Sequence, residues 1–184
     1  MVLPVLPIIF AEPLIVIGLP DRFSWQQTIL CLALLNLVAV LWIHFLREAV
    51  GGGDFRRYIE TLPLSRGALT RLDAFVVGIA GWPFFLVVLT ALILMPEGRL
   101  SGDEIVQCCL RMAVVSVLFV AAQVLYLQKP VGMITVLAIG DAVLFATGRA
   151  PYPLGFTVLL VFGGALAFVL AGGHLPPRVL GAGP

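Results

Sequence analysis

The chain has very few charged residues. Of its 184 residues, 11% are Asp, Glu, Lys or Arg, whereas soluble domains carry about 25%. The net charge is only +1, so the chain lacks the basic face that neutralises nucleic-acid phosphates, and no nucleic-acid partner is expected. Apolar residues make up 61% of the chain, more than a soluble core of this size could bury. The composition therefore predicts a protein that resides in a lipid bilayer.

Patterns of metal ligands and nucleophiles are also missing. The chain has two histidines and three cysteines, without the spacing of a zinc site or a disulfide framework. There is no nucleophile elbow, phosphate-binding glycine loop or zinc-protease motif. We therefore expect no metal, no cofactor and no catalytic residue, and we interpret the cysteines as small buried apolar side chains.

The chain does contain six long apolar runs. A helix needs about 20 apolar residues to cross the hydrocarbon layer of about 30 Å. We therefore predict an all-α integral membrane protein of about six transmembrane helices, with one transmembrane domain over residues 1–184. The predicted spans are Leu3–Leu19, Thr28–Phe45, Ala74–Met95, Ile105–Leu127, Val131–Thr147 and Leu154–Ala171.

Two of these runs contain helix breakers. The first is short and holds three prolines and Glu12, so it is expected to be kinked or to enter the membrane without crossing it. A signal peptide is the alternative, but the run has no basic segment before it and no small-residue cleavage site after it. The third run contains Gly78, Gly81 and Pro83, which predict a kink.

The longest connection, residues 48–73, is predicted to be a cytoplasmic elbow. Five arginines lie in it or at its edge, and cytoplasmic connections of membrane proteins are rich in Lys and Arg. Alternation along the chain then places both termini in the cytoplasm, with seven basic residues inside and three outside. The seven are Arg47, Arg56, Arg57, Arg66, Arg71, Lys129 and Arg178.

The elbow contains the pattern of a short surface helix. Phe55, Ile59 and Leu62 recur at helical spacing, which predicts one apolar face. Pro63 ends this helix, and Ser65 is placed to cap the next one, which continues into the third span. One interpretation is an interfacial helix whose arginines contact anionic lipid headgroups.

The order of these features also resembles a known family. A surface helix after the second span, then Leu62-Pro63-Leu64-Ser65-Arg66 and a third span, is similar to the coupling-helix region of type-2 ABC exporter permeases. Six spans with cytoplasmic termini also resemble that family. The resemblance implies that the elbow binds an ATPase through Phe55, Arg56, Arg57, Tyr58, Ile59, Leu62, Pro63, Ser65 and Arg66.

The same resemblance implies a function. It indicates a permease subunit of an ABC-type exporter in the cell inner membrane, without enzymatic activity of its own. Its implied partners are ATP-binding cassette ATPase subunits, a second permease copy in a homodimer or heterodimer, and membrane lipids. The alternative is a non-transporting membrane scaffold or assembly subunit.

Three charged residues lie inside predicted spans. Arg111 and Asp141 each lie six residues from the outer end of a span, or about 9 Å deep. Equal depth allows an ion pair, and Glu12 is a second candidate partner for Arg111. The alternative is that Arg111 extends outward, with Asp141 protonated or bonded to nearby backbone. An intramembrane enzyme that uses Asp141 or Glu12 is disfavoured, because few polar groups share one depth.

Overall fold

The computed structural model describes residues 6–50, 66–94, 100–128 and 130–171. Within these residues every regular element is a helix, so the predicted all-α class is confirmed there. The helices are α1 (Leu6–Gly18), η1 (Pro20–Arg22), α2 (Trp25–Val50), α4 (Arg66–Ala80), α5 (Trp82–Ile93), α6 (Gly102–Gln128), α7 (Pro130–Thr147) and α8 (Tyr152–Leu170).

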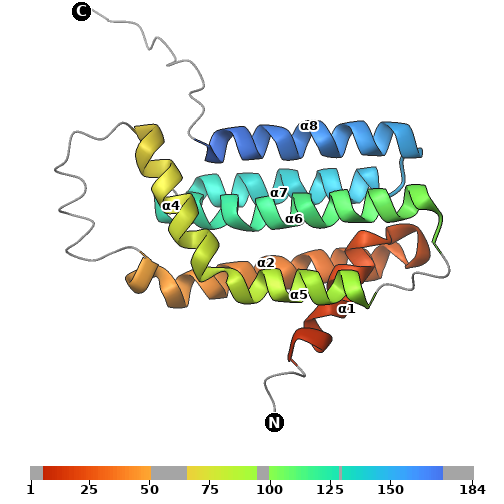
Figure 1. The fold of residues 1–184 in the computed structure, drawn as a ribbon, viewed down its shortest axis with the longest axis horizontal. Helices are drawn as coiled ribbons and strands as arrows, with labels where there is room; N and C mark the ends of the chain where they lie inside the picture. The colour runs from red at the N-terminus through yellow and green to blue at the C-terminus, as the bar shows by residue number, and fades with distance from the viewer. Residues whose placement is uncertain (1–5, 51–65, 95–99, 129, 172–184) are drawn as a thin grey trace, which may run out of the picture.

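Helix α6 is the centre of the bundle. Helices α2, α5, α6, α7 and α8 run roughly along one direction, and α1 and α4 cross it obliquely (Figure 1). Helix α6 contacts α1, α2, α4, α5, α7 and α8. Half of its apolar stretch is buried, compared with 22% for α2 and 11% for α8. The other long helices therefore present most of their surface to the surroundings of the protein.

These outward surfaces are apolar. Large side chains such as Leu30, Phe45, Ile93, Val131 and Val161 are all well exposed. In water such continuous apolar surface would drive aggregation, whereas in lipid it meets acyl chains. The bundle is therefore built as a helical membrane protein.

Three helices are long and apolar enough to cross a membrane, namely α2, α6 and α8. Helices α4 and α5 form a pair bent by 61°, which would count as a fourth span if it crosses as one unit. Helix α7 has 18 residues and the described part of α1 has 13, so at about 1.5 Å per residue these measure about 27 and 20 Å. Helices of these lengths fall short of a perpendicular crossing, and the count of six spans stays a prediction.

The predicted kink in the third apolar run is confirmed at Gly81. The N–H of Gly81 donates the last bond of α4 to the carbonyl of Val77 at 2.8 Å, and its own carbonyl accepts from Phe84 at 2.9 Å. Pro83 is the second residue of α5, in the first turn, where its lack of an N–H leaves no helical hydrogen bond unmade. Beyond the bend, Phe84 stacks on Phe119 of α6 with ring centroids 3.9 Å apart. The bend therefore docks α5 against the central helix.

Three helices begin at the same end of the bundle, and two of them carry hydrogen-bonded caps there. Helices α2, α6 and α8 all begin at the right of Figure 1 and end at the left. Ser24 and Gln27 form a reciprocal capping box at the start of α2, and Ser101 and Glu104 form another at the start of α6. Each box satisfies two backbone N–H groups that a helix start leaves unpaired.

Candidate functional site

Arg111 is the most deeply buried charged side chain among the described residues, with 1% exposure. Its Nη1 donates to the carbonyl oxygen of Ile17 at 3.5 Å and to that of Leu144 at 3.4 Å. These carbonyls belong to the last turns of α1 and α7, where the helix dipole is negative and bonding within the helix is incomplete. We call this arrangement the Arg111 site. It joins the ends of α1 and α7 to the central helix.

The suggested partners of Arg111 are not its partners in the structure. Arg111 forms no ion pair with Asp141 or Glu12, and no carboxylate of the described residues lies within ion-pair distance of it. Asp21 adds a favourable Coulomb interaction from farther away. The side chain is buried rather than extended outward, and its Nε has no hydrogen-bond partner among the described residues. The proposed ion pair is therefore corrected to a contact with helix ends.

Asp141 instead bonds to a residue of α2. Its Oδ2 accepts a hydrogen bond from the Nδ2 of Asn36, and both side chains are half-buried. This contact replaces both the predicted pairing with Arg111 and the alternative bond to backbone. Equal depth in the membrane did not bring Asp141 to Arg111, because the two side chains leave their helices toward different neighbours. Glu12 is exposed on α1.

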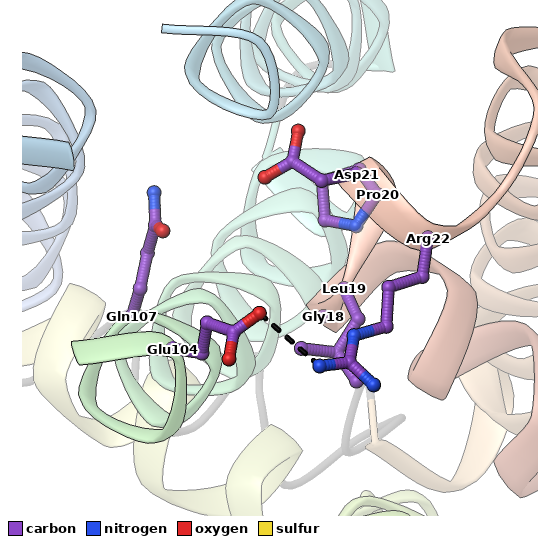
Figure 2. A pocket seen from close by; sticks show the side chains of 7 residues that line it. All are labelled: Gly18, Leu19, Pro20, Asp21, Arg22, Glu104 and Gln107. Carbon is purple, nitrogen blue, oxygen red and sulfur yellow. Dashed lines mark hydrogen bonds and ion pairs between the residues drawn. The ribbon is translucent and has the colours of Figure 1, made fainter. Parts of the chain in front are cut away.

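A small pocket lies at the end where α2 and α6 begin (Figure 2). Arg22 of η1 and Glu104 of α6 form an ion pair of 3.2 Å across it. Glu104 also accepts the backbone N–H of Ser101 at 2.7 Å, so one carboxylate both caps α6 and ties η1 to it. Figure 2 shows Asp21 pointing away from this pair. The lining residues are Gly18, Leu19, Pro20, Asp21, Arg22, Glu104 and Gln107.

Gly148 lets the chain between α7 and α8 approach this end closely. A Cβ at Gly148 would lie 2.7 Å from the Cγ of Pro20 and 3.2 Å from Nη1 of Arg111. The proline ring has little freedom to move away, so a side chain at this position would displace η1 or Arg111. A glycine here is thus a requirement of the Arg111 site.

Other polar side chains lie toward the ends of α2 and α6. The Nδ1 of His44 lies 3.3 Å from the hydroxyl of Tyr126, which joins α2 to α6. Gln123 is buried, and its Nε2 has no partner among the described residues. Of the two glycines in the last apolar run, Gly163 packs against Val114 and Gly164 faces open space.

The predicted coupling-helix residues mostly lie outside the described residues. These are Phe55, Arg56, Arg57, Tyr58, Ile59, Leu62, Pro63 and Ser65. Arg66 is the first residue of α4, so that helix begins directly after Ser65. The elbow residues Arg71 and Asp73 also belong to α4. The ATPase-binding role of the elbow stays a prediction.

Several residues of these contacts were not predicted. Asn36 is the one amide in the apolar run over 28–45, and a polar residue inside a span commonly bonds to another helix. The capping boxes also have a sequence signature, in which Ser precedes Gln27 or Glu104 by three positions. Nothing in the sequence indicates that Arg22 pairs with Glu104, because this contact depends on how α1 packs against α6.

The side chains that could bind a metal ion are scattered in the described part of the chain. No group of three His, Cys, Asp or Glu side chains there could hold a metal ion, and Cys31, Cys108 and Cys109 are free thiols. Of these, Cys108 is buried as predicted, whereas Cys109 is exposed. Comparison of the chain with protein-family models, with curated proteins and with solved structures gives no match.

Proposed function

We propose that this chain is the membrane-spanning permease subunit of an ABC-type exporter in the cell inner membrane. It would work with separate ATP-binding cassette subunits and with a second permease copy. The observation that carries the proposal is the path to the central helix from Arg66, the residue that follows Leu62-Pro63-Leu64-Ser65 in the sequence. Helix α4 begins at Arg66, directly after this segment, and turns by 61° at Gly81 into α5, which stacks on α6 through Phe84 and Phe119.

This path supports a mechanical role for the elbow. In the proposal, ATP is bound and hydrolysed in the partner subunit, and the elbow over residues 48–73 moves with it. Phe55 and Ile59 insert their apolar side chains into the ATPase, and the arginines contact its acidic groups. Since α4 is one continuous helix from Arg66 to Ala80, displacement of its start shifts the bend and the Phe84–Phe119 contact.

The opposite end of the bundle supplies the contacts that such a motion changes. In the proposal this end faces the outside, and the Arg111 site and the Arg22–Glu104 pair hold it closed. The hydrogen bonds of Arg111 are long, at 3.4 and 3.5 Å, and the ion pair is partly exposed. Contacts of this kind contribute modestly and separate readily. Export would require α1 and α7 to move apart there.

The alternative function is a non-transporting membrane scaffold or assembly subunit. The observation that favours it is that the charged side chains inside the bundle hold helices together. Arg111 and Asp141 both join helices to one another, and neither lines the small pocket. In the scaffold case the elbow lies on the lipid surface and binds no ATPase.

Co-purification tests the proposal. The chain is expressed with an ATP-binding cassette protein encoded beside it, and the complex is purified from membranes. Phe55→Asp and Arg57→Glu are each expected to reduce the amount of co-purified ATPase severalfold, because they place a carboxylate in the proposed contact. Gln26→Glu is the control, since it also introduces a carboxylate, at an exposed position of α2 at the other end.

The outcomes separate the two functions. Loss of ATPase with both elbow variants and retention with Gln26→Glu supports the permease assignment. If the ATPase binds and neither elbow variant weakens it, the coupling role is wrong. If no ATPase co-purifies with the unaltered chain, the scaffold function is favoured.

A further inference from the structure

Asn36 and Asp141 lie at the border between the buried and the outward faces of their helices. One turn away on the buried side are Leu32 of α2 and Leu144 of α7, both nearly inaccessible. One turn away on the outward side are the exposed alanines Ala33 and Ala138. We call the outward area formed by Asn36, Asp141 and these two alanines the α2–α7 surface.

The Asn36–Asp141 pair has unused hydrogen-bonding capacity. An amide has two N–H groups and a carboxylate has two oxygens, and the contact uses one of each. Among the described residues, the second N–H and the Oδ1 of Asn36 and the Oδ1 of Asp141 have no hydrogen-bond partner. Neither side chain is sealed inside the bundle, since both are only half-buried. A donor and an acceptor are therefore available at the surface.

Lipid is a poor neighbour for this surface. Acyl chains offer no hydrogen bonds, and ionisable side chains within membrane spans rarely face them. The outward area of α2 and α7 around this pair is largely apolar, including Leu37, Val131 and Ile139, so lipid suits it; the exposed Thr135 of α7 satisfies its hydroxyl within its own helix, by donating to the carbonyl of Val131. The polar pair accordingly indicates a protein partner with its own donor and acceptor at the same depth.

We propose that the α2–α7 surface is the contact surface for a second copy of this chain. A two-fold axis brings the same surface patch of both copies together. The free N–H of Asn36 in one copy then donates to Asp141 of the other, and the reverse contact follows by symmetry. Any other partner would have to present a matching donor and acceptor, whereas a second copy always does.

The flanking alanines support close contact. Small side chains let transmembrane helices approach one another, and polar side chains between such helices form hydrogen bonds. Ala33 and Ala138 stand one turn from the polar pair on α2 and α7, toward the outward face. The outward side of α8 has no comparable polar pair, since residues such as Leu160 and Val161 form it. The inference rests on the proposed function, because it identifies where the second permease copy would bind.

Cross-linking of single cysteines tests the surface. Cys31, Cys108 and Cys109 are replaced by alanine, and Ala138→Cys is introduced into the full chain in native membranes. A short bis-maleimide is expected to convert most of this variant to a band of twice the chain mass. Ala165→Cys is the matched control, because Ala165 is an exposed alanine of α8, and it is expected to stay monomeric.

A second measurement tests the polar contact itself. Asp141→Leu and Asn36→Leu should each weaken self-association by about tenfold, because the symmetric contact loses two interhelical hydrogen bonds. The exchanged variant, with Asn36→Asp and Asp141→Asn together, keeps one amide and one carboxylate and should restore association. Fluorescence transfer between differently labelled copies in vesicles measures the equilibrium.

The possible outcomes are distinct. Cross-linking at Ala138 but not at Ala165, with restoration by the exchanged variant, supports the inference. Equal cross-linking at both sites, no cross-linking at Ala138, or an adduct with a different protein overturns it. ATPase co-purification is scored on the same membranes. If the ATPase binds but Ala138 does not cross-link, only the dimer surface is wrong. If Ala138 cross-links without any bound ATPase, the permease function fails and the dimer stands.

Discussion

A buried guanidinium loses the hydration that stabilises its charge, and Arg111 recovers part of this loss from two helix ends. The carbonyls of Ile17 and Leu144 are acceptors in the last turns of α1 and α7, and that of Leu144 also accepts from the hydroxyl of Thr147. Asp141 recovers part of its own lost hydration by accepting a hydrogen bond from the amide of Asn36. Each charged side chain therefore joins a different set of helices, and the two should act independently.

Double-mutant cycles measure this independence. Asn36→Leu and Asp141→Leu are expected to be coupled by about 1 kcal/mol of unfolding free energy, as for other interhelical hydrogen bonds. Arg111→Leu and Asp141→Leu should be additive within about 0.5 kcal/mol, because they share no partner. Reversible unfolding in mixed micelles, at concentrations that keep the chain monomeric, measures both cycles. A larger coupling for Arg111 with Asp141 than for Asn36 with Asp141 would contradict these contacts.

The two glycines Gly148 and Gly164 give a matched comparison of packing. Gly148→Ala is expected to lower the free energy of unfolding by about 1–3 kcal/mol, because the new Cβ overlaps the ring of Pro20. Gly164→Ala should be neutral or stabilising by up to about 1 kcal/mol, since it meets no atom and alanine favours a helix. Thermal unfolding in detergent compares the variants. Equal effects at both positions would show that the connection between α7 and α8 does not pack closely against Pro20.

At the scale of the helix, the bend between α4 and α5 sets how the third apolar run fits the bundle. Gly81 and Pro83 both oppose a continuous helix, by about 1 and up to about 3 kcal/mol relative to alanine. The stacked rings of Phe84 and Phe119 hold the bent form with about 0.5–1.5 kcal/mol. The helix breakers therefore outweigh the stacking contact in maintaining the bend.

Replacing both breakers should consequently straighten the pair. In the variant with Gly81→Ala and Pro83→Ala, spin labels at Leu72 and Ile93 are expected to move apart, as measured by pulsed electron resonance. Gly78→Ala is the control, because Gly78 lies in α4 with nothing near a new Cβ, and it should leave the distance unchanged. A label distance that also stays unchanged in the double variant would mean that packing against α1 and α6 determines the bend.

At the scale of the molecule, the starts of α2, α6 and α8 lie together at one end of the bundle. The Arg22–Glu104 pair and the Arg111 site occupy this end. The basic elbow over residues 48–73 follows the opposite end of α2. The distribution of basic residues predicts that the elbow end is cytoplasmic.

Labelling of single cysteines tests this orientation in a chain without its three native cysteines. Gln26→Cys and Arg149→Cys should react with an impermeant maleimide added to intact cells, whereas Ala171→Cys should react only after lysis. Gln26 and Arg149 are at one end of the bundle and Ala171 is at the other. The reverse pattern would show that the orientation is inverted. Different results for Gln26 and Arg149 would contradict the arrangement of the helices.

The sequence alone determined the features that depend on neighbours along the chain. Apolar composition predicted helices for a membrane, and the pair of Gly81 and Pro83 predicted the bend. These features follow from local backbone chemistry and from the length of apolar runs. The same rule applies to the prolines of the first run, whose described part forms α1 with Pro13 inside it.

Only the tertiary structure decided which polar groups meet. Depth in a membrane can be counted along a helix, but the direction in which a side chain points depends on how the helices are rotated and packed. Arg111 therefore contacts the ends of α1 and α7, and Asp141 contacts Asn36. Only the structure shows that α6 is the central helix. Helices α2, α6 and α8 are similarly apolar, and hydropathy does not distinguish a face toward lipid from a face toward another helix.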